Sequence, residues 1–211
     1  MFSNGIGFPE TLAILGRSNG GFLVGAALVQ RPELFRAVYC KVPLLDMVRY
    51  PNFQVAKYWV PEYGDPDEAE EYQWLYAYSP YHNVRDGVKY PAVFLKTTEG
   101  DSRVDPMHAM KMAARLQAAT NGLMDEAPII LTVDSREGHG LSRPVEKMVQ
   151  KMSKSIVFLA HHTGLSLKMH DQLAMPASPL SRDGFTIRTT HRRRGPLRDD
   201  IMVRALQTEC P

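Results

Sequence analysis

The sequence predicts an α/β protein built on a parallel sheet with flanking helices, and two observations lead to this fold class. Short apolar or β-branched runs recur along the chain, and they alternate with longer segments in which small and apolar residues follow a helical spacing. Strands that alternate with helices form parallel sheets, whose ligands bind beyond the carboxyl ends of the strands. The residues that directly follow each apolar run are therefore the first candidates for a functional site.

The first predicted elements are a strand and a helix joined by a tight turn. The run LAIL at 12–15 is apolar and ends in glycine. The segment 22–35 (FLVGAALVQRPELF) combines small and apolar residues, as a buried helix does, and Pro32 closes it. Ser18 lies in the turn between them.

Three more strands and two more helices follow. We expect strands at 37–45, 90–98 and 127–135, because these segments are rich in β-branched and aromatic residues. A helix is expected over 105–120, where Asp-Pro provides a start signal and Asn-Gly ends the pattern. A last helix is expected over 144–164, with one broad apolar face that comprises Val145, Met148, Val149, Met152, Ile156 and Leu159.

Two segments depart from this alternation. Residues 51–83 are rich in Tyr, Trp and acids, and we expect a helical excursion there that walls a pocket. Residues 166–211 carry turn formers and the Arg cluster at 192–194 without sustained periodicity, which predicts a disordered basic tail. The domain organisation expected is thus a partial catalytic domain over 1–165 and a tail over 166–211.

Charge and composition exclude several classes of function. The formal net charge is +2, and the basic excess lies in the tail, so the main body has no nucleic-acid-binding footprint. Cys40 and Cys210 show neither a zinc spacing nor a CxxC motif, and we expect free thiols, no metal and no cofactor. The chain opens on no targeting pattern and holds no run long enough to cross a bilayer, which predicts a cytoplasmic protein away from membranes.

The turn after the first strand matches the pattern GxSxG. Gly16 and Gly20 lie two residues on either side of Ser18, a spacing that permits a sharp strand-to-helix turn with an exposed serine hydroxyl. The dipole of the following helix points its positive end at the same place. Ser18 is therefore a candidate nucleophile.

A nucleophilic serine needs a base and an acid. His139 lies in the glycine-rich loop EGHG between the last strand and the last helix, and Asp101 follows the third strand directly. The order Ser, Asp, His along the chain is that of α/β-hydrolases. Asp46, Glu99 and Asp105 also stand near strand ends, and each of these acids can instead be a helix cap or a solvated loop residue.

Several stretches together resemble the prolyl oligopeptidase family of serine peptidases over about residues 2–165: GRSNGGFLVGAALVQRPELFRAV, VPLLDMVRY, YWVPEYGDP, YSPYHNV, YPAVFLKTTEGDSRVDPMHAMKMAARLQ and REGHG. The resemblance implies a serine endopeptidase that cleaves short peptides after proline through an acyl-enzyme. It implies Ser18 as nucleophile, Asp101 as triad acid and His139 as general base, the same three residues that the motifs select.

The resemblance also implies the residues that hold substrate. Trp59 would stack on the proline ring, Tyr63 and Val104 would line its pocket, and Arg103 would hold a substrate carbonyl. The oxyanion would be bound by the backbone N–H of Asn19 and by a tyrosine from far upstream, a residue that the seventeen positions before Ser18 do not supply. Trp59 can alternatively be an ordinary core residue.

Members of the family that this sequence resembles have further strands before the nucleophile strand and a β-propeller. By that comparison, this chain would hold an incomplete sheet and no propeller. The strand before Ser18 would then be an edge through which copies can associate. Two other functions stay open at this point: a carboxylesterase that uses the same triad on small esters, and an inactive fragment that needs a partner to fold. If the chain is a prolyl-specific peptidase, as the resemblance implies, its expected partner is a short proline-containing peptide substrate.

Overall fold

The computed structural model describes residues 7–120, 127–135 and 145–166, and it holds a four-stranded parallel sheet between helices. The strands are β1 (Ala13–Arg17), β2 (Ala37–Lys41), β3 (Ala92–Thr98) and β4 (Ile129–Asp134), in the spatial order β1-β2-β3-β4. The predicted fold class, an α/β parallel sheet with flanking helices, is confirmed. Within the described residues β1 pairs with β2 alone, so it lies at an edge of the sheet.

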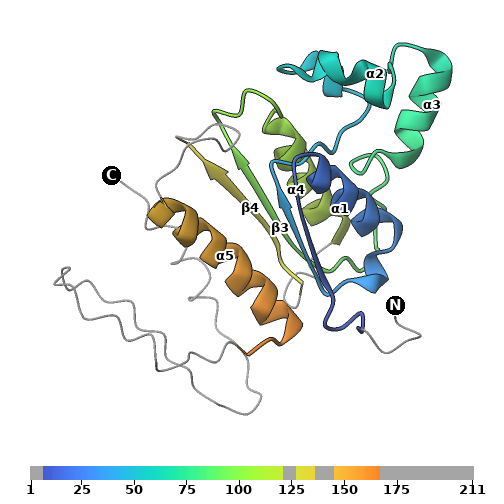
Figure 1. Cartoon of the computed structure of the whole chain (residues 1–211). Helices are drawn as coiled ribbons and strands as arrows, with labels where there is room; N and C mark the ends of the chain where they lie inside the picture. Colours follow the sequence, from blue (N-terminus) through green and yellow to red (C-terminus); the bar gives the residue numbers. More distant parts are fainter. Residues whose placement is uncertain (1–6, 121–126, 136–144, 167–211) are drawn as a thin grey trace. The chain divides into compact units, whose positions relative to one another are not determined.

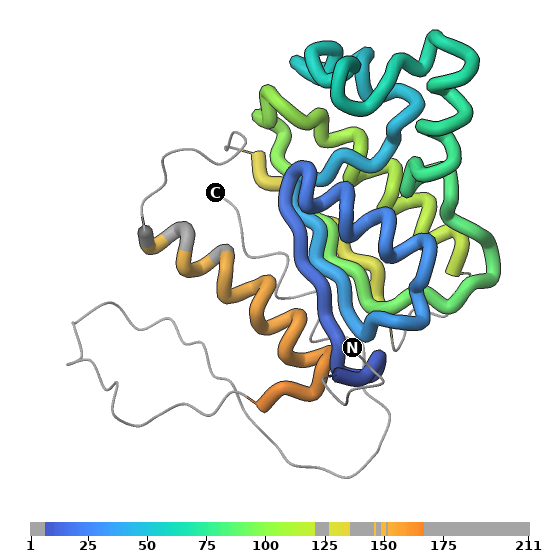
Figure 2. Tube along the Cα trace, turned by 45° about the vertical axis from the view of Figure 1, so that its right-hand side comes forward, coloured from blue at the N-terminus to red at the C-terminus, as the bar shows by residue number. Residues whose placement is uncertain are grey.

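Helices cover both faces of the sheet (Figure 1). On one face lie α1 (Asn19–Gln30) and α4 (Met107–Thr120), each of which crosses over between consecutive parallel strands. On the other face lies α5 (Val145–Thr163), the helix that follows β4. Figure 2 shows the helices on the two faces of the sheet from another side.

Alternate strand residues feed two separate cores, as the period of two in a strand requires. Val38 and Cys40 of β2 face α1 and α4, where they pack with Leu28, Leu116 and other buried residues. Tyr39, between them in sequence, faces α5 and packs in a smaller cluster with Phe94 and Phe158.

The excursion predicted over 51–83 is helical. It consists of two short 3-10 helices, η3 (Tyr50–Asn52) and η4 (Ala56–Trp59), followed by α2 (Val60–Tyr63) and α3 (Ala69–Tyr78). These helices pack in a buried cluster that they share with the loops after β2 and β3, which comprises Leu44, Met47, Tyr50, Ala56, Leu75 and Val104. These helices lie together beyond the carboxyl ends of the strands, at the top of Figure 1.

The strand predicted over 37–45 is too long. It ends at Lys41, because Val42 adopts a left-handed φ of 42° and donates its N–H to the Lys96 carbonyl at 2.7 Å. A β-branched residue rarely takes this conformation, and such outliers gather at functional sites. The turn at Val42 directs Pro43 and Leu44 away from the sheet.

The last helix is present where it was predicted, but its apolar face is only partly covered. Phe158 and Ala160 are buried against the sheet, whereas Val149, Met152 and Ile156 are about half exposed, at 55%, 54% and 47%. Within the described parts of the chain, no helix combines the length and apolar content that crossing a membrane demands. Residues 167–211, nearly all of the predicted tail, lie outside the described residues.

Candidate active site

Ser18 occupies a strained turn between β1 and α1. Its backbone has φ 55° and ψ −122°, a conformation that costs a non-glycine residue on the order of 1–3 kcal/mol. Two hydrogen bonds hold the turn: the Ser18 N–H donates to the Lys41 carbonyl at 2.9 Å, and the Ser18 carbonyl accepts from the Phe22 N–H at 3.1 Å. The strain is thus sustained by the neighbouring strand and the helix.

Two glycines allow this turn to close, and only one of them, Gly16, belongs to the GxSxG motif. A Cβ at Gly16 would lie 2.0 Å from the Gly20 carbonyl oxygen, and one at Gly21 would lie 2.7 Å from the Cβ of Pro43. Nothing lies within 4 Å of the place where a Cβ at Gly20 would stand. The close approaches that require glycine are therefore at Gly16 and Gly21.

Asn19 is the first residue of α1 and directly follows Ser18. The first helical hydrogen bond runs from Phe22 to Ser18, so the N–H of Asn19 has no acceptor within the helix. Together with the positive end of the helix dipole, this N–H can stabilise negative charge that develops beside Ser18. The side-chain Oδ1 of Asn19 accepts a hydrogen bond from the Tyr63 hydroxyl at 3.0 Å.

Asp101 is 1% exposed and organises the loop after β3. Its Oδ1 accepts the backbone N–H groups of Arg103 and Val104, both at 2.9 Å. These two bonds fold residues 101–104 into a tight turn. The turn brings Arg103 and Val104 to the pocket beside Ser18.

A pocket of about 120 Å³ opens beside the serine. It brings together six of the residues predicted from sequence: Ser18, Asn19, Trp59, Tyr63, Arg103 and Val104. Trp59 ends η4 and also packs against the buried cluster of the excursion. It therefore lines the pocket and contributes to the core, the two positions that the sequence left open for it. The helical excursion thus supplies one wall of the pocket, and the Asp101 turn supplies another.

Two pocket residues were missed by the sequence reasoning, Leu44 and Glu62. Leu44 reaches the pocket because the chain turns at Val42, and the strand-like composition of 37–45 hid that turn. Glu62 stands one position before Tyr63 in α2 and is exposed. Glu62 follows Trp59 by three residues, and residues at this spacing are neighbours on a helix, so the sequence could have indicated that Glu62 lies beside Trp59 at the pocket.

Two of the competing acids, Asp46 and Asp105, have structural roles. Asp105 caps α4, since its Oδ1 accepts the N–H of Met107 at 2.9 Å. Asp46 is fully buried and forms an ion pair with Lys111. Burial would raise the pKa of Asp46, but the hydrogen bond from Lys111 and the charges of Lys111 and His82 outweigh it, and the pKa is lowered.

His108 lies beside Asp46 and binds the same loop. Its Nδ1 accepts the backbone N–H groups of Leu45 and Asp46, at 3.3 and 3.0 Å, so this nitrogen carries no proton. Burial lowers the pKa of His108 to about 4, which keeps the ring neutral at pH 7. His139, the predicted base, lies outside the described residues. No group of three His, Cys, Asp or Glu gathers like metal ligands in the portions that the structure describes.

Comparison with known proteins adds to this geometry. Residues 1–166 match the prolyl oligopeptidase family. The chain is 36% identical over 167 residues to a prolyl endopeptidase of Elizabethkingia meningoseptica, an alignment that covers 78% of this chain and 23% of that protein.

Solved structures similar to this chain include those of proline-specific peptidases. A post-proline cleaving enzyme from Rickettsia typhi superposes with a TM-score of 0.73 at 34% identity, over 78% of this chain and 23% of that one. Prolyl oligopeptidase B of Galerina marginata, bound to a 35mer substrate, superposes with a TM-score of 0.69 at 34% identity, over 76% and 22%. The chain spans less than a quarter of the length of these relatives.

Proposed function

This chain belongs to the prolyl oligopeptidase family, and from that premise we propose that it acts as a serine endopeptidase that hydrolyses short peptides after proline. The observation that carries the proposal is the strained Ser18 turn, which lines one pocket together with Trp59, Leu44 and Val104. A proline ring is compact, rigid and apolar, so a flat aromatic side chain gives it favourable contact. Relatives named as prolyl endopeptidases support the same substrate class.

The proposed reaction has two stages. Ser18 Oγ attacks the carbonyl carbon of the proline residue, while His139 takes the hydroxyl proton. The oxyanion that forms accepts the N–H of Asn19, and the intermediate collapses as His139 returns the proton to the leaving amine. Water then attacks the acyl-enzyme with His139 again as base, which frees the peptide acid and restores Ser18.

Asp101 would orient the protonated His139 in this scheme. Its burial and its two backbone hydrogen bonds give the carboxylate a fixed position at the start of the 101–104 turn. A fixed carboxylate selects one tautomer of the histidine and stabilises the imidazolium that forms in each stage. Arg103, at the pocket, would hold a substrate carbonyl with a guanidinium that needs no change of protonation.

The test is turnover of a blocked Gly-Pro fluorogenic amide, together with labelling by a fluorophosphonate probe. We expect Ser18→Ala to abolish labelling and to lower kcat by at least about 10³-fold. Ser153→Ala is the matched control, because Ser153 is an exposed serine of α5 whose hydroxyl bonds the Val149 carbonyl. Equal turnover by Ser18→Ala and Ser153→Ala would contradict the proposal, as would faster cleavage of a Gly-Ala amide than of the Gly-Pro amide.

A further inference from the structure

Tyr63 links the pocket wall to the residue beside the serine. Its hydroxyl donates to Asn19 Oδ1 at 3.0 Å, across 44 positions of sequence. Tyr63 ends α2 in the excursion, and Asn19 begins α1 behind the Ser18 turn. The same side chain therefore lines the pocket and contacts the neighbour of the nucleophile.

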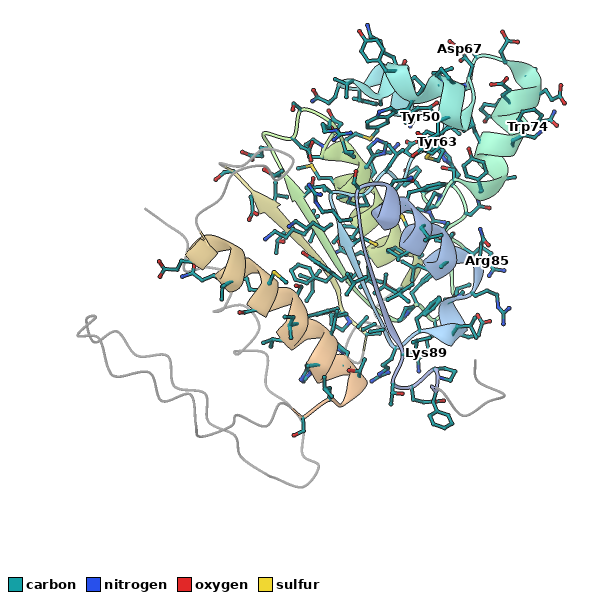
Figure 3. The ribbon with its side chains drawn as sticks, in the orientation of Figure 1. Tyr50, Tyr63, Asp67, Trp74, Arg85 and Lys89 are labelled. Atoms are coloured by element: carbon teal, nitrogen blue, oxygen red, sulfur yellow. The ribbon has the colours of Figure 1, made fainter. Side chains whose placement is uncertain are left out.

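The ring of Tyr63 is held on two sides. It meets Phe22 of α1 edge to face, with ring centroids 6.0 Å apart and planes at 81°. It meets Tyr50 of η3 in the same manner, at 5.7 Å and 83°, and Figure 3 shows Tyr50 and Tyr63 together below α2. Such edge-to-face pairs are favoured by the aromatic quadrupole.

The main chain at Tyr63 is held as well. The Tyr63 carbonyl accepts the hydroxyl of Tyr78 at 3.1 Å, and the carbonyl of the next residue, Gly64, accepts the hydroxyl of Tyr50 at 2.6 Å. Gly64 has φ 113°, which lets the chain leave α2 at once. With its ring and its backbone both fixed, Tyr63 can hold its hydroxyl at one place.

The hydroxyl also remains a donor. Burial and the nearby Glu62 carboxylate raise the pKa of Tyr63 to about 12, so the phenol keeps its proton throughout the neutral range. Asn19 is exposed, and its side chain would otherwise sample several rotamers at the start of a helix. The bond from Tyr63 selects one of them.

We infer that Tyr63 is a positioning residue, whose hydroxyl fixes Asn19 so that the Asn19 N–H points at the oxyanion that forms on the substrate carbonyl when Ser18 attacks it. The inference rests on the proposed function, and it adds a second task to a residue expected only to line the pocket. Since the link matters most when charge develops beside Ser18, removing the hydroxyl affects kcat more than KM. Tyr63 itself touches no reacting atom in this scheme.

The experiment compares Tyr63→Phe with Tyr58→Phe in the full chain, on the Gly-Pro amide. Tyr63→Phe keeps the ring and its packing, and we expect kcat to fall about fivefold while KM changes less than about twofold. Tyr58 is 72% exposed and serves as the control, with both constants unchanged. A rise in KM alone would show that the hydroxyl only binds substrate, and it would overturn the inference.

A double-mutant cycle tests whether Tyr63 acts through Asn19. Asn19→Ala keeps the backbone N–H but removes the acceptor of the Tyr63 hydroxyl. In that background we expect Tyr63→Phe to have no further effect on kcat. Additive losses would overturn the inference, since they would mean that Tyr63 acts by another route.

A measurement without turnover separates this inference from the proposed function. In ¹⁵N NMR spectra, Tyr63→Phe is expected to shift the backbone and side-chain amide resonances of Asn19, and Tyr58→Phe is not. If Asn19 responds while no form of the chain cleaves the Gly-Pro amide, the proposed function fails and the Tyr63–Asn19 link stands without a catalytic role. If the Asn19 resonances stay unchanged, the inference fails whatever the activity.

Discussion

The two faces of the sheet differ in how completely they are covered. On the face of α1 and α4, Leu28 is 1% exposed and Leu116 is fully buried. On the face of α5, Leu15 of the edge strand β1 is 67% exposed, and Met152 and Ile156 of α5 itself are 54% and 47% exposed. Because the free energy gained from burial follows the apolar area removed from water, most of the stability of the described chain comes from the first face.

The Ser18 turn depends on the well-covered face. Its N–H bonds the carbonyl of Lys41 in β2, and Gly21 packs on Pro43, which follows the same strand. The first contact comes from β2, the strand that pairs with β1, and the second comes from α1, which covers the well-packed face. The geometry of the candidate nucleophile is therefore fixed from the side of the molecule that is closed, although its strand lies at the sheet edge.

The largest expected effect tests the close approach at the turn. Gly16→Ala would place a Cβ 2.0 Å from a backbone oxygen, so the turn must open, and we expect a loss of about 4 kcal/mol in the free energy of unfolding. Gly20→Ala, in the same motif, has open space and is expected to be neutral or to add up to ~1 kcal/mol through helix propensity. Urea unfolding of both variants measures the difference, and equal losses would mean that the turn tolerates a side chain at either glycine.

The next effect compares two leucines of one helix. Leu28 and Leu23 both lie in α1, at 1% and 69% exposure. Leu28→Ala removes buried methyl groups from the main core and is expected to cost about 3 kcal/mol, while Leu23→Ala should cost less than ~0.5 kcal/mol. A large loss for Leu23→Ala in the same urea experiment would show that another surface covers Leu23 in solution.

A smaller effect depends on pH and concerns His108. Its folded pKa of about 4 lies below the ordinary value of 6.5, so the unfolded chain binds more protons and stability falls as the pH drops below 6.5. Between pH 7 and pH 5 this group should remove about 2 kcal/mol of stability. The charged groups that act on its ring are Asp46, Asp105 and Lys111.

The variant His108→Asn isolates this contribution. Its Oδ1 can accept the N–H groups of Leu45 and Asp46 in place of Nδ1, but it does not titrate. We expect the loss of stability from pH 7 to pH 5 to be about 2 kcal/mol smaller in this variant than in the wild type. His162, whose pKa is also lowered to about 4, chiefly by burial, contributes equally to both proteins and cancels. The same pH dependence in both would contradict the neutral, buried role of His108.

The order and type of the main elements were predictable because local signals agree with the fold. The apolar run that begins β3 predicted a strand that is buried at every position, and the Asp-Pro start signal preceded α4. The carboxyl-end rule for parallel sheets also located the pocket, since Ser18 and the Asp101 turn both follow strands. The catalytic roles of Ser18, Asp101 and His139 remain predictions.

What the sequence hid depends on contacts between distant segments. The turn at Val42 is held by the carbonyl of Lys96 on another strand, so a valine with a strong strand preference is overruled, and Leu44 reaches the pocket. The need for glycine at Gly21 comes from Pro43, 22 positions away. In α5 the periodicity showed which residues share a face, but not that Met152 and Ile156 of that face stay exposed.

The smallest expected effect concerns the less covered face of the sheet, the face of α5. It tests whether a second copy of the chain covers the β1 edge. Leu15→Thr keeps a residue suited to strands at a position that is 67% exposed, so it should change the free energy of unfolding by less than ~0.5 kcal/mol. Val38→Thr, at the fully buried neighbouring strand, is the matched control and should cost ~1–3 kcal/mol through an unpaired hydroxyl. A loss above ~1.5 kcal/mol for Leu15→Thr, together with a sedimentation coefficient that rises with concentration in the wild type and not in the variant, would contradict this expectation. That outcome would mean that a second copy covers the β1 edge and that the two faces differ less in solution than in the isolated chain.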